Sequence, residues 1–142
     1  MKNNMDALNE IHKGCSMGII ALEMILKKTD DNSFKELLEK QLKEYQDISI
    51  RSDQLYKEYT SSEIDTTNMM EKLMTFYGIE KDTILDSSSS HLADILINGT
   101  NMGIVEGRKI LNNKKLDKHV KKICKEYITV QEKYLDKLKE YL

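Results

Sequence analysis

The absence of proline is the feature that most restricts what this chain can fold into. The 142 residues include no proline and only 6 glycines, whereas a fold rich in loops or β-turns needs both residue types. Most of the chain must therefore run in long uninterrupted segments, which favours helices. At this length a single hydrophobic core is expected. We therefore predict an all-α fold in which residues 1–142 form one domain.

Apolar residues recur every three or four positions along four long stretches, which is the spacing of one face of an α-helix. Ser33 and Glu36 add a capping-box pattern at the start of the second stretch. The four stretches span about residues 3–29, 33–62, 87–112 and 116–142. Each predicts a long helix.

A short helix and an ambiguous segment lie between the second and third long stretches. Residues 66–77 are rich in Met and are followed by Gly78, a residue type that commonly comes after the last turn of a helix. Residues 78–88 show no clear pattern, so their placement stays open. Because the other two connections are short, we predict an antiparallel up-down-up-down four-helix bundle whose short extra helix caps one end.

The charge balance and the short apolar runs exclude several classes of partner. The 24 acidic and 22 basic residues leave a net charge of −2, which gives no overall attraction to nucleic acid or to an anionic membrane. The N-terminus lacks a signal-peptide core, and no apolar run is long enough to cross a bilayer. We therefore expect a cytoplasmic protein with no nucleic-acid or membrane partner.

Cysteine and arginine usage give two smaller indications. Cys15 and Cys124 form no CxxC motif, so we interpret both as buried apolar residues in a reducing compartment. Arginine occurs only at Arg51 and Arg108, beside abundant Lys, Ile and Asn. This bias is typical of an AT-rich bacterial genome.

Glycines recur every four residues in the third long helix, inside the sequence NGTNMGIVEG. Each costs about 1 kcal/mol relative to alanine in a helix interior, so the repeat requires a compensating close approach. The first helix carries small residues of its own at similar positions. The predicted close-packing groove consists of Gly14, Gly18, Gly99, Gly103 and Gly107.

Three arrangements account for such a groove. The two glycine-bearing helices could contact each other inside the bundle. One groove could instead form the contact of a symmetric homodimer. The groove could also leave room for a small planar ligand or cofactor.

A polar layer inside the bundle is the second candidate site. In the predicted arrangement, counting about 1.5 Å per residue from the shared turns places four side chains at one level: Glu23, Gln41, Glu106 and His119. Glu106 lies within the apolar arc of its helix, and a carboxylate that faces a core must be paired, hydrogen-bonded, protonated or bound to metal. The layer could fix the helix register through Gln41, or it could bind a transition metal.

The sequence LNEIHKGCSMGIIALEMILKKTDDNSFKELLEKQLKEY, residues 8–45, resembles the first helical hairpin of small bacterial ferritin-like proteins of unknown function. The resemblance is one of pattern and covers about the first 60 residues best. It implies a ferritin-like four-helix bundle.

Di-iron enzymes of the ferritin-like class use one Glu from each of two helices and a Glu-x-x-His pair from each of the others. By this resemblance Glu23 and Glu106 would stand for the single glutamates. The pairs are absent, since the chain has Gln41-Leu-Lys-Glu44 and His119-Val-Lys-Lys122 at the corresponding places. Di-iron chemistry is therefore not predicted.

Lysines crowd the beginning of the last helix, where the helix dipole disfavours cations. They are Lys114, Lys115, Lys118, Lys121, Lys122 and Lys125. They form either a solvated face that nearby acidic side chains offset or a contact for an acidic partner.

No motif for a nucleophile with its base, a phosphate loop or a dinucleotide site occurs in the chain. Neither enzyme activity nor a cofactor is predicted. We hypothesise a non-enzymatic helical bundle that acts through protein–protein contacts, as a homodimer or other homo-oligomer, or as a component of a bacterial assembly. The alternative is a metal- or small-molecule-binding ferritin-like bundle that uses the polar layer around Glu106.

Overall fold

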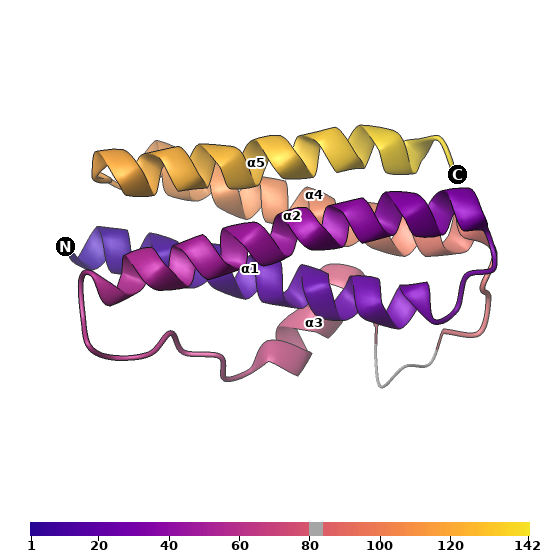
Figure 1. Cartoon of the computed structure of the whole chain (residues 1–142), viewed down its shortest axis with the longest axis horizontal. Helices are drawn as coiled ribbons and strands as arrows, with labels where there is room; N and C mark the ends of the chain where they lie inside the picture. Colours follow the sequence, from indigo (N-terminus) through magenta and orange to yellow (C-terminus); the bar gives the residue numbers. More distant parts are fainter. Residues whose placement is uncertain (80–83) are drawn as a thin grey trace.

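A computed structural model describes residues 1–79 and 84–142 of the chain (Figure 1). Within these residues the structure contains five helices and no strand, which confirms the all-α prediction. Residues 80–83, part of the segment left open between 78 and 88, lie outside the described residues. The helices are α1 (Lys2–Leu26), α2 (Asn32–Lys57), α3 (Met69–Tyr77), α4 (Ser89–Asn113) and α5 (Lys118–Lys139).

Short polar side chains set the starting points of α2 and α4. The Asp31 carboxylate accepts a hydrogen bond from the Phe34 N–H at 3.1 Å, and the Ser88 hydroxyl accepts one from the His91 N–H at 3.3 Å. Both bonds satisfy N–H groups that the first helical turn leaves free. The predicted cap of α2, Ser33, is wrong by two positions, because Asp31 takes this role.

Contacts between helix ends show the direction of each long helix. The Ser89 hydroxyl donates to Asp31 at 3.0 Å, so α2 and α4 begin at the same end of the molecule. The Asp117 N–H donates to the Asn4 side chain at 2.7 Å, so α1 and α5 begin together at the other end. Tyr59, just after α2, donates to Asp117 at 2.7 Å. The helices therefore run up-down-down-up, with α1 and α5 in one direction and α2 and α4 in the other (Figure 1).

The predicted up-down-up-down order is therefore wrong. The connection from α2 to α4 runs back along the molecule to the end where α2 began, and α3 lies within it (Figure 1). Nor does α3 cap one end, because it packs on the sides of α1 and α4. Its buried residues Leu73 and Tyr77 find their apolar partners there. Apolar spacing identifies the helices but does not say along which path the chain crosses between them.

The long helices pack as two hairpins. α1 lies on α2 and α4 lies on α5, and the hairpins meet where α1 contacts α4 and α5 and where α2 contacts α5. Fully buried apolar side chains at three-and-four spacing fill the space between them, including Leu8, Ile11, Leu22, Leu38, Ile48, Leu92, Leu96, Val120 and Leu138. None of the helices in the described ranges is long and apolar enough to cross a membrane.

The helix glycines make room for side chains from facing helices. At each of these glycines, an added Cβ atom would come too close to a neighbouring side chain. The neighbours are Tyr127 at Gly14, Tyr45 at Gly18, Tyr77 at Gly99, Gln131 at Gly103 and Ile128 at Gly107. Loss of the Cβ atom therefore allows three tyrosine rings and a glutamine to enter the centre of the bundle.

The side chains beside the glycines show how the three predicted arrangements compare with the structure. α1 and α4 do contact each other, but a side chain from another helix fills the space beside each of the five glycines. The structure therefore leaves no groove there for a planar ligand or for the backbone of a second copy. The predicted close approach is present, but the partners are mainly aromatic side chains.

We expect Gly14→Ala to destabilise the protein by about 1–3 kcal/mol, because the new Cβ atom would overlap the Tyr127 hydroxyl and overpack the core. This loss would override the gain of about 1 kcal/mol that alanine brings to a helix. Urea unfolding of Gly14→Ala, of Tyr127→Phe and of the double variant Gly14→Ala/Tyr127→Phe measures the effect on the free energy of unfolding. The double variant should recover part of the loss, since Phe lacks the overlapping oxygen. A Gly14→Ala protein as stable as the parent would contradict this packing.

Candidate functional site

The polar layer predicted around Glu106 does not form inside the bundle. The Glu106 side chain is 39% exposed and pairs with Lys109 at 3.6 Å, while Glu23 and His119 are exposed. Only Gln41 is buried, at 1% exposure. Glu106 lies beside the buried face of α4 and not within it, so its side chain reaches solvent. The prediction also assumed that α4 runs parallel to α1, and reversing α4 moves Glu106 to a different level of the bundle. The prediction of a buried metal or ligand site formed by Glu23, Gln41, Glu106 and His119 is therefore wrong.

Gln41 belongs to a different buried polar group. Its Nε2 donates to the Tyr45 hydroxyl at 3.1 Å, and the buried Thr100 lies beside the same tyrosine. Within the described ranges, Gln41 Oε1 and Thr100 Oγ1 have no hydrogen-bond partner. Burial raises the pKa of Tyr45, partly offset by the bond from Gln41. The group is a compact part of the core, since the Tyr45 ring packs against Gly18.

The cysteines and the central tyrosines stay protonated. Cys15 and Cys124 are both buried, as predicted. Burial raises the pKa of Cys15, and it raises the pKa of Cys124 to about 11, so both stay as thiols. Burial likewise raises the pKa of Tyr77 and Tyr127. In residues 1–79 and 84–142 no group of three or more His, Cys, Asp or Glu side chains could hold a metal ion.

Two adjoining hollows lie outside the core, along the seam between α2 and α5. Their volumes are about 360 and 410 Å³, and both are lined by Arg51, Lys122 and Glu126. The apolar side chains that line them are Leu55 and Ile123 in one and Ile48 and Val130 in the other. We call these two hollows together the α2–α5 groove.

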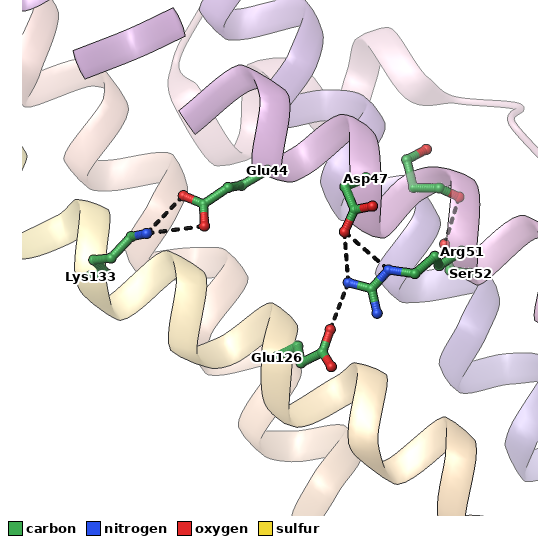
Figure 2. A network of polar contacts seen from close by, with 7 residues as sticks. Glu44, Asp47, Arg51, Ser52, Glu126 and Lys133 are labelled. Carbon is green, nitrogen blue, oxygen red and sulfur yellow. Dashed lines mark hydrogen bonds and ion pairs between the residues drawn. The ribbon is translucent and has the colours of Figure 1, made fainter. Parts of the chain in front are cut away.

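Ion pairs cross the α2–α5 groove and tie the two hairpins together (Figure 2). Arg51 lies between Glu126 at 2.6 Å and Asp47 at 2.8 Å. About two helical turns away from this cluster, Lys133 of α5 contacts Glu44 of α2 at 2.9 Å. The hydrogen bond that Arg51 donates to Glu126 is the main reason that the pKa of Arg51 is raised.

Glu44 is the carboxylate most affected by these contacts. Its partial burial pushes its pKa upward, but hydrogen bonds from Lys133 and Tyr134 outweigh burial, so the pKa of Glu44 lies below the ordinary value of 4.5. The charged form is therefore stabilised in the folded protein.

The two rims of the groove carry opposite charge. Apart from Arg51 and Glu126, which pair with each other across the groove, the charged residues of the α2 rim are Glu44, Asp47 and Glu58, and those of the α5 rim are Lys122 and Lys125. His119 also lies on the α5 rim. Of the residues predicted for a site, only His119 lies here. Sequence reasoning missed Arg51 and Glu126, although a signal existed, since Arg51 is one of only two arginines in a lysine-rich chain.

Comparisons with known proteins give no match. No family model fits the chain, and no curated protein or solved structure is similar to it. The resemblance of residues 8–45 to small ferritin-like proteins therefore stays a prediction.

The lowered pKa of Glu44 predicts an acid dependence of stability. A group whose folded pKa is depressed contributes fully above its unfolded pKa, and the contribution is lost as pH falls through the folded pKa. We expect Glu44→Gln to be less stable than the parent at about pH 7 and the gap to narrow below about pH 4.5. Urea unfolding of the parent and of Glu44→Gln at each pH measures the difference in their free energies of unfolding. Glu36→Gln, which removes an exposed pair within α2, should change little, and a Glu44→Gln gap that does not vary with pH would contradict the assignment.

The raised pKa values of Tyr45, Tyr77 and Tyr127 predict alkaline unfolding. A raised folded pKa gives stability below the unfolded value of about 10, and this stability is lost as pH rises further. Tyrosinate absorbance should therefore rise in two stages, the second together with the loss of helical circular dichroism. Tyr127→Phe should reduce the second stage. Complete ionisation of all tyrosines in a chain that remains helical would contradict this prediction.

Proposed function

We propose that this chain is a non-enzymatic, ferritin-like four-helix bundle that acts in the bacterial cytoplasm through protein–protein contacts, as a homodimer joined at the α2–α5 groove. The groove carries the proposal, because it combines an apolar floor with rims of opposite charge. The single long crossover between α2 and α4 supports the ferritin-like likeness, since ferritin-like folds have one such connection.

The opposite charges of the rims favour a second copy of the chain as the occupant. A twofold axis parallel to the helices would place α2 of one copy against α5 of the other. The acidic rim of each copy would then face the basic rim of its partner, with Glu58 and Gln54 near Lys122 of the other copy. In such an isologous contact the charges of both rims of each copy are paired with charges of opposite sign on the other copy.

The size of the face suits a stable dimer. α2 and α5 lie side by side over roughly 30 Å at about 1.5 Å per residue, and two helices are about 20 Å wide. The resulting footprint of roughly 600 Å² per copy, before side-chain relief is added, approaches the roughly 800 Å² per partner of standard interfaces. Of the apolar residues that line the groove, the half-buried Leu55 and Val130 would be covered by it, whereas Ile48 and Ile123 are already buried within one copy.

Analytical ultracentrifugation tests the homodimer. The parent protein should sediment as a dimer at micromolar concentration, and Lys122→Glu/Lys125→Glu should sediment as a folded monomer because both rims become acidic. The matched control is Lys27→Glu/Lys35→Glu, which makes the same charge change near the α1–α2 turn and should remain dimeric. A monomeric parent, or a control that dissociates equally, would contradict the proposal.

A mixing experiment sharpens this test. The variant Gln54→Lys/Glu58→Lys makes the α2 rim more basic and should also be monomeric. An equimolar mixture of this variant with Lys122→Glu/Lys125→Glu should restore dimers that contain one copy of each. Failure of the mixture to associate would count against the paired rims even if each variant alone is a monomer.

A further inference from the structure

Several lysines lie close together near the α4–α5 turn. Among the residues that the structure describes, no carboxylate lies within ion-pair distance of Lys115, Lys118, Lys121, Lys122 or Lys125. All five are exposed. Lys118, Lys121, Lys122 and Lys125 recur at the spacing of one helix face, so their positive charges gather on one side of α5.

The carboxylates near these lysines are already engaged elsewhere. Asp117 accepts a hydrogen bond from Tyr59 at 2.7 Å. Four others form ion pairs with different cations: Asp6 with Lys114, Glu106 with Lys109, Glu126 with Arg51 and Glu132 with Arg108. The sequence left open whether nearby acidic groups offset the lysines, and the structure shows that these groups serve other partners.

The position of the lysines also makes them locally unfavourable. Lys115 precedes α5, and Lys118 and Lys121 lie in its first turn, where the helix dipole is positive. Asp117 precedes the helix but makes no side-chain cap, because its carboxylate faces Tyr59. Unfavourably placed charge that no carboxylate of residues 1–79 or 84–142 pairs with is typical of a binding surface.

Two hollows with apolar floors lie beside the lysines, between α4 and α5. One, of about 250 Å³, is lined by Leu111, Leu116 and the lysines at 114, 115 and 121. The other, of about 220 Å³, is lined by Arg108, Leu111, Lys125, Ile128 and Thr129. We call these hollows and the lysines around them the α4–α5 face.

We propose that the α4–α5 face binds an acidic, amphipathic segment of a different protein. The carboxylates of the segment pair with Lys115, Lys118 and Lys121, and its apolar side chains enter the hollows on either side of Leu111. Binding here does not require the homodimer, because Lys115, Lys118 and Lys121 do not line the α2–α5 groove, and only Lys125 and Thr129 border both surfaces.

Charge and shape select this partner over others. A second copy is disfavoured, because a twofold contact would place lysines against lysines. A nucleic acid would leave the apolar floor unused, and the chain offers only two arginines for phosphate contacts. A lipid surface suits protruding apolar side chains, whereas Leu111 and Ile128 lie at the base of recesses.

Fluorescence anisotropy with a labelled helical peptide tests the proposal. The peptide is built from Glu and Leu, with the leucines on one face, and it is titrated with the full chain. Lys115→Gln/Lys118→Gln/Lys121→Gln should bind it at least about tenfold more weakly. The control Lys27→Gln/Lys35→Gln/Lys43→Gln removes the same charge elsewhere and should stay within about twofold of the parent.

Folding and competing ligands are checked in the same series. Urea unfolding should find the triple lysine variant at least as stable as the parent, since it removes cations from the start of a helix. An all-Glu peptide, a single-stranded oligonucleotide of equal charge and anionic phosphatidylserine vesicles should each bind more weakly than the Glu–Leu peptide. Equal binding of any of these, equal loss in the control, or no peptide binding would overturn the proposal. A monomeric parent would contradict only the homodimer.

Discussion

The fold depends on aromatic side chains entering spaces that glycines leave open. Tyr45, Tyr77 and Tyr127 come from three different helices, and each reaches a glycine of α1 or α4. Since each helix glycine costs about 1 kcal/mol in propensity, the burial of a large ring must compensate. Tyr77 extends this packing to α3, and so the long crossover is held against the side of the bundle. One kind of contact thus sets both the distance between the hairpins and the path of the connection.

Because side chains fill the centre of the bundle, the candidate binding sites lie on its surface. α5 contributes to both of them, the α2–α5 groove and the α4–α5 face. On the side of α2, ion pairs such as Arg51–Glu126 join the hairpins, and the rims carry both signs of charge. On the side of α4, Lys115, Lys118 and Lys121 pair with no carboxylate of the described part of the chain, and they lie around recesses lined by Leu111 and Ile128. Mixed charge suits contact with an identical copy, whereas charge of one sign requires a different, acidic partner. The two faces of one helix therefore favour different kinds of association.

Local features could be predicted from the sequence, and features that depend on the path of the chain could not. The helices follow from apolar spacing, and Gln41 was placed in the core because it lies at the centre of its apolar seam. Glu106 lies beside the buried face of α4 and not within it, and its level in the bundle depends on the direction of α4, which no local pattern specifies. The partners of the glycines were missed for the same reason, since Tyr77 reaches Gly99 only through the crossover. The glycine repeat nevertheless indicated correctly that something approaches closely.

Native-state hydrogen exchange tests the central claim most directly. If tyrosine rings fill the spaces beside the glycines, the backbone amides of residues 14–18 and 99–107 should exchange only through global unfolding, with the highest protection in the chain. Their exchange free energies should then equal the free energy of unfolding from urea denaturation. Fast exchange at these amides, while the ends of α1 and α4 stay protected, would show an open or loosely filled centre and would contradict the account.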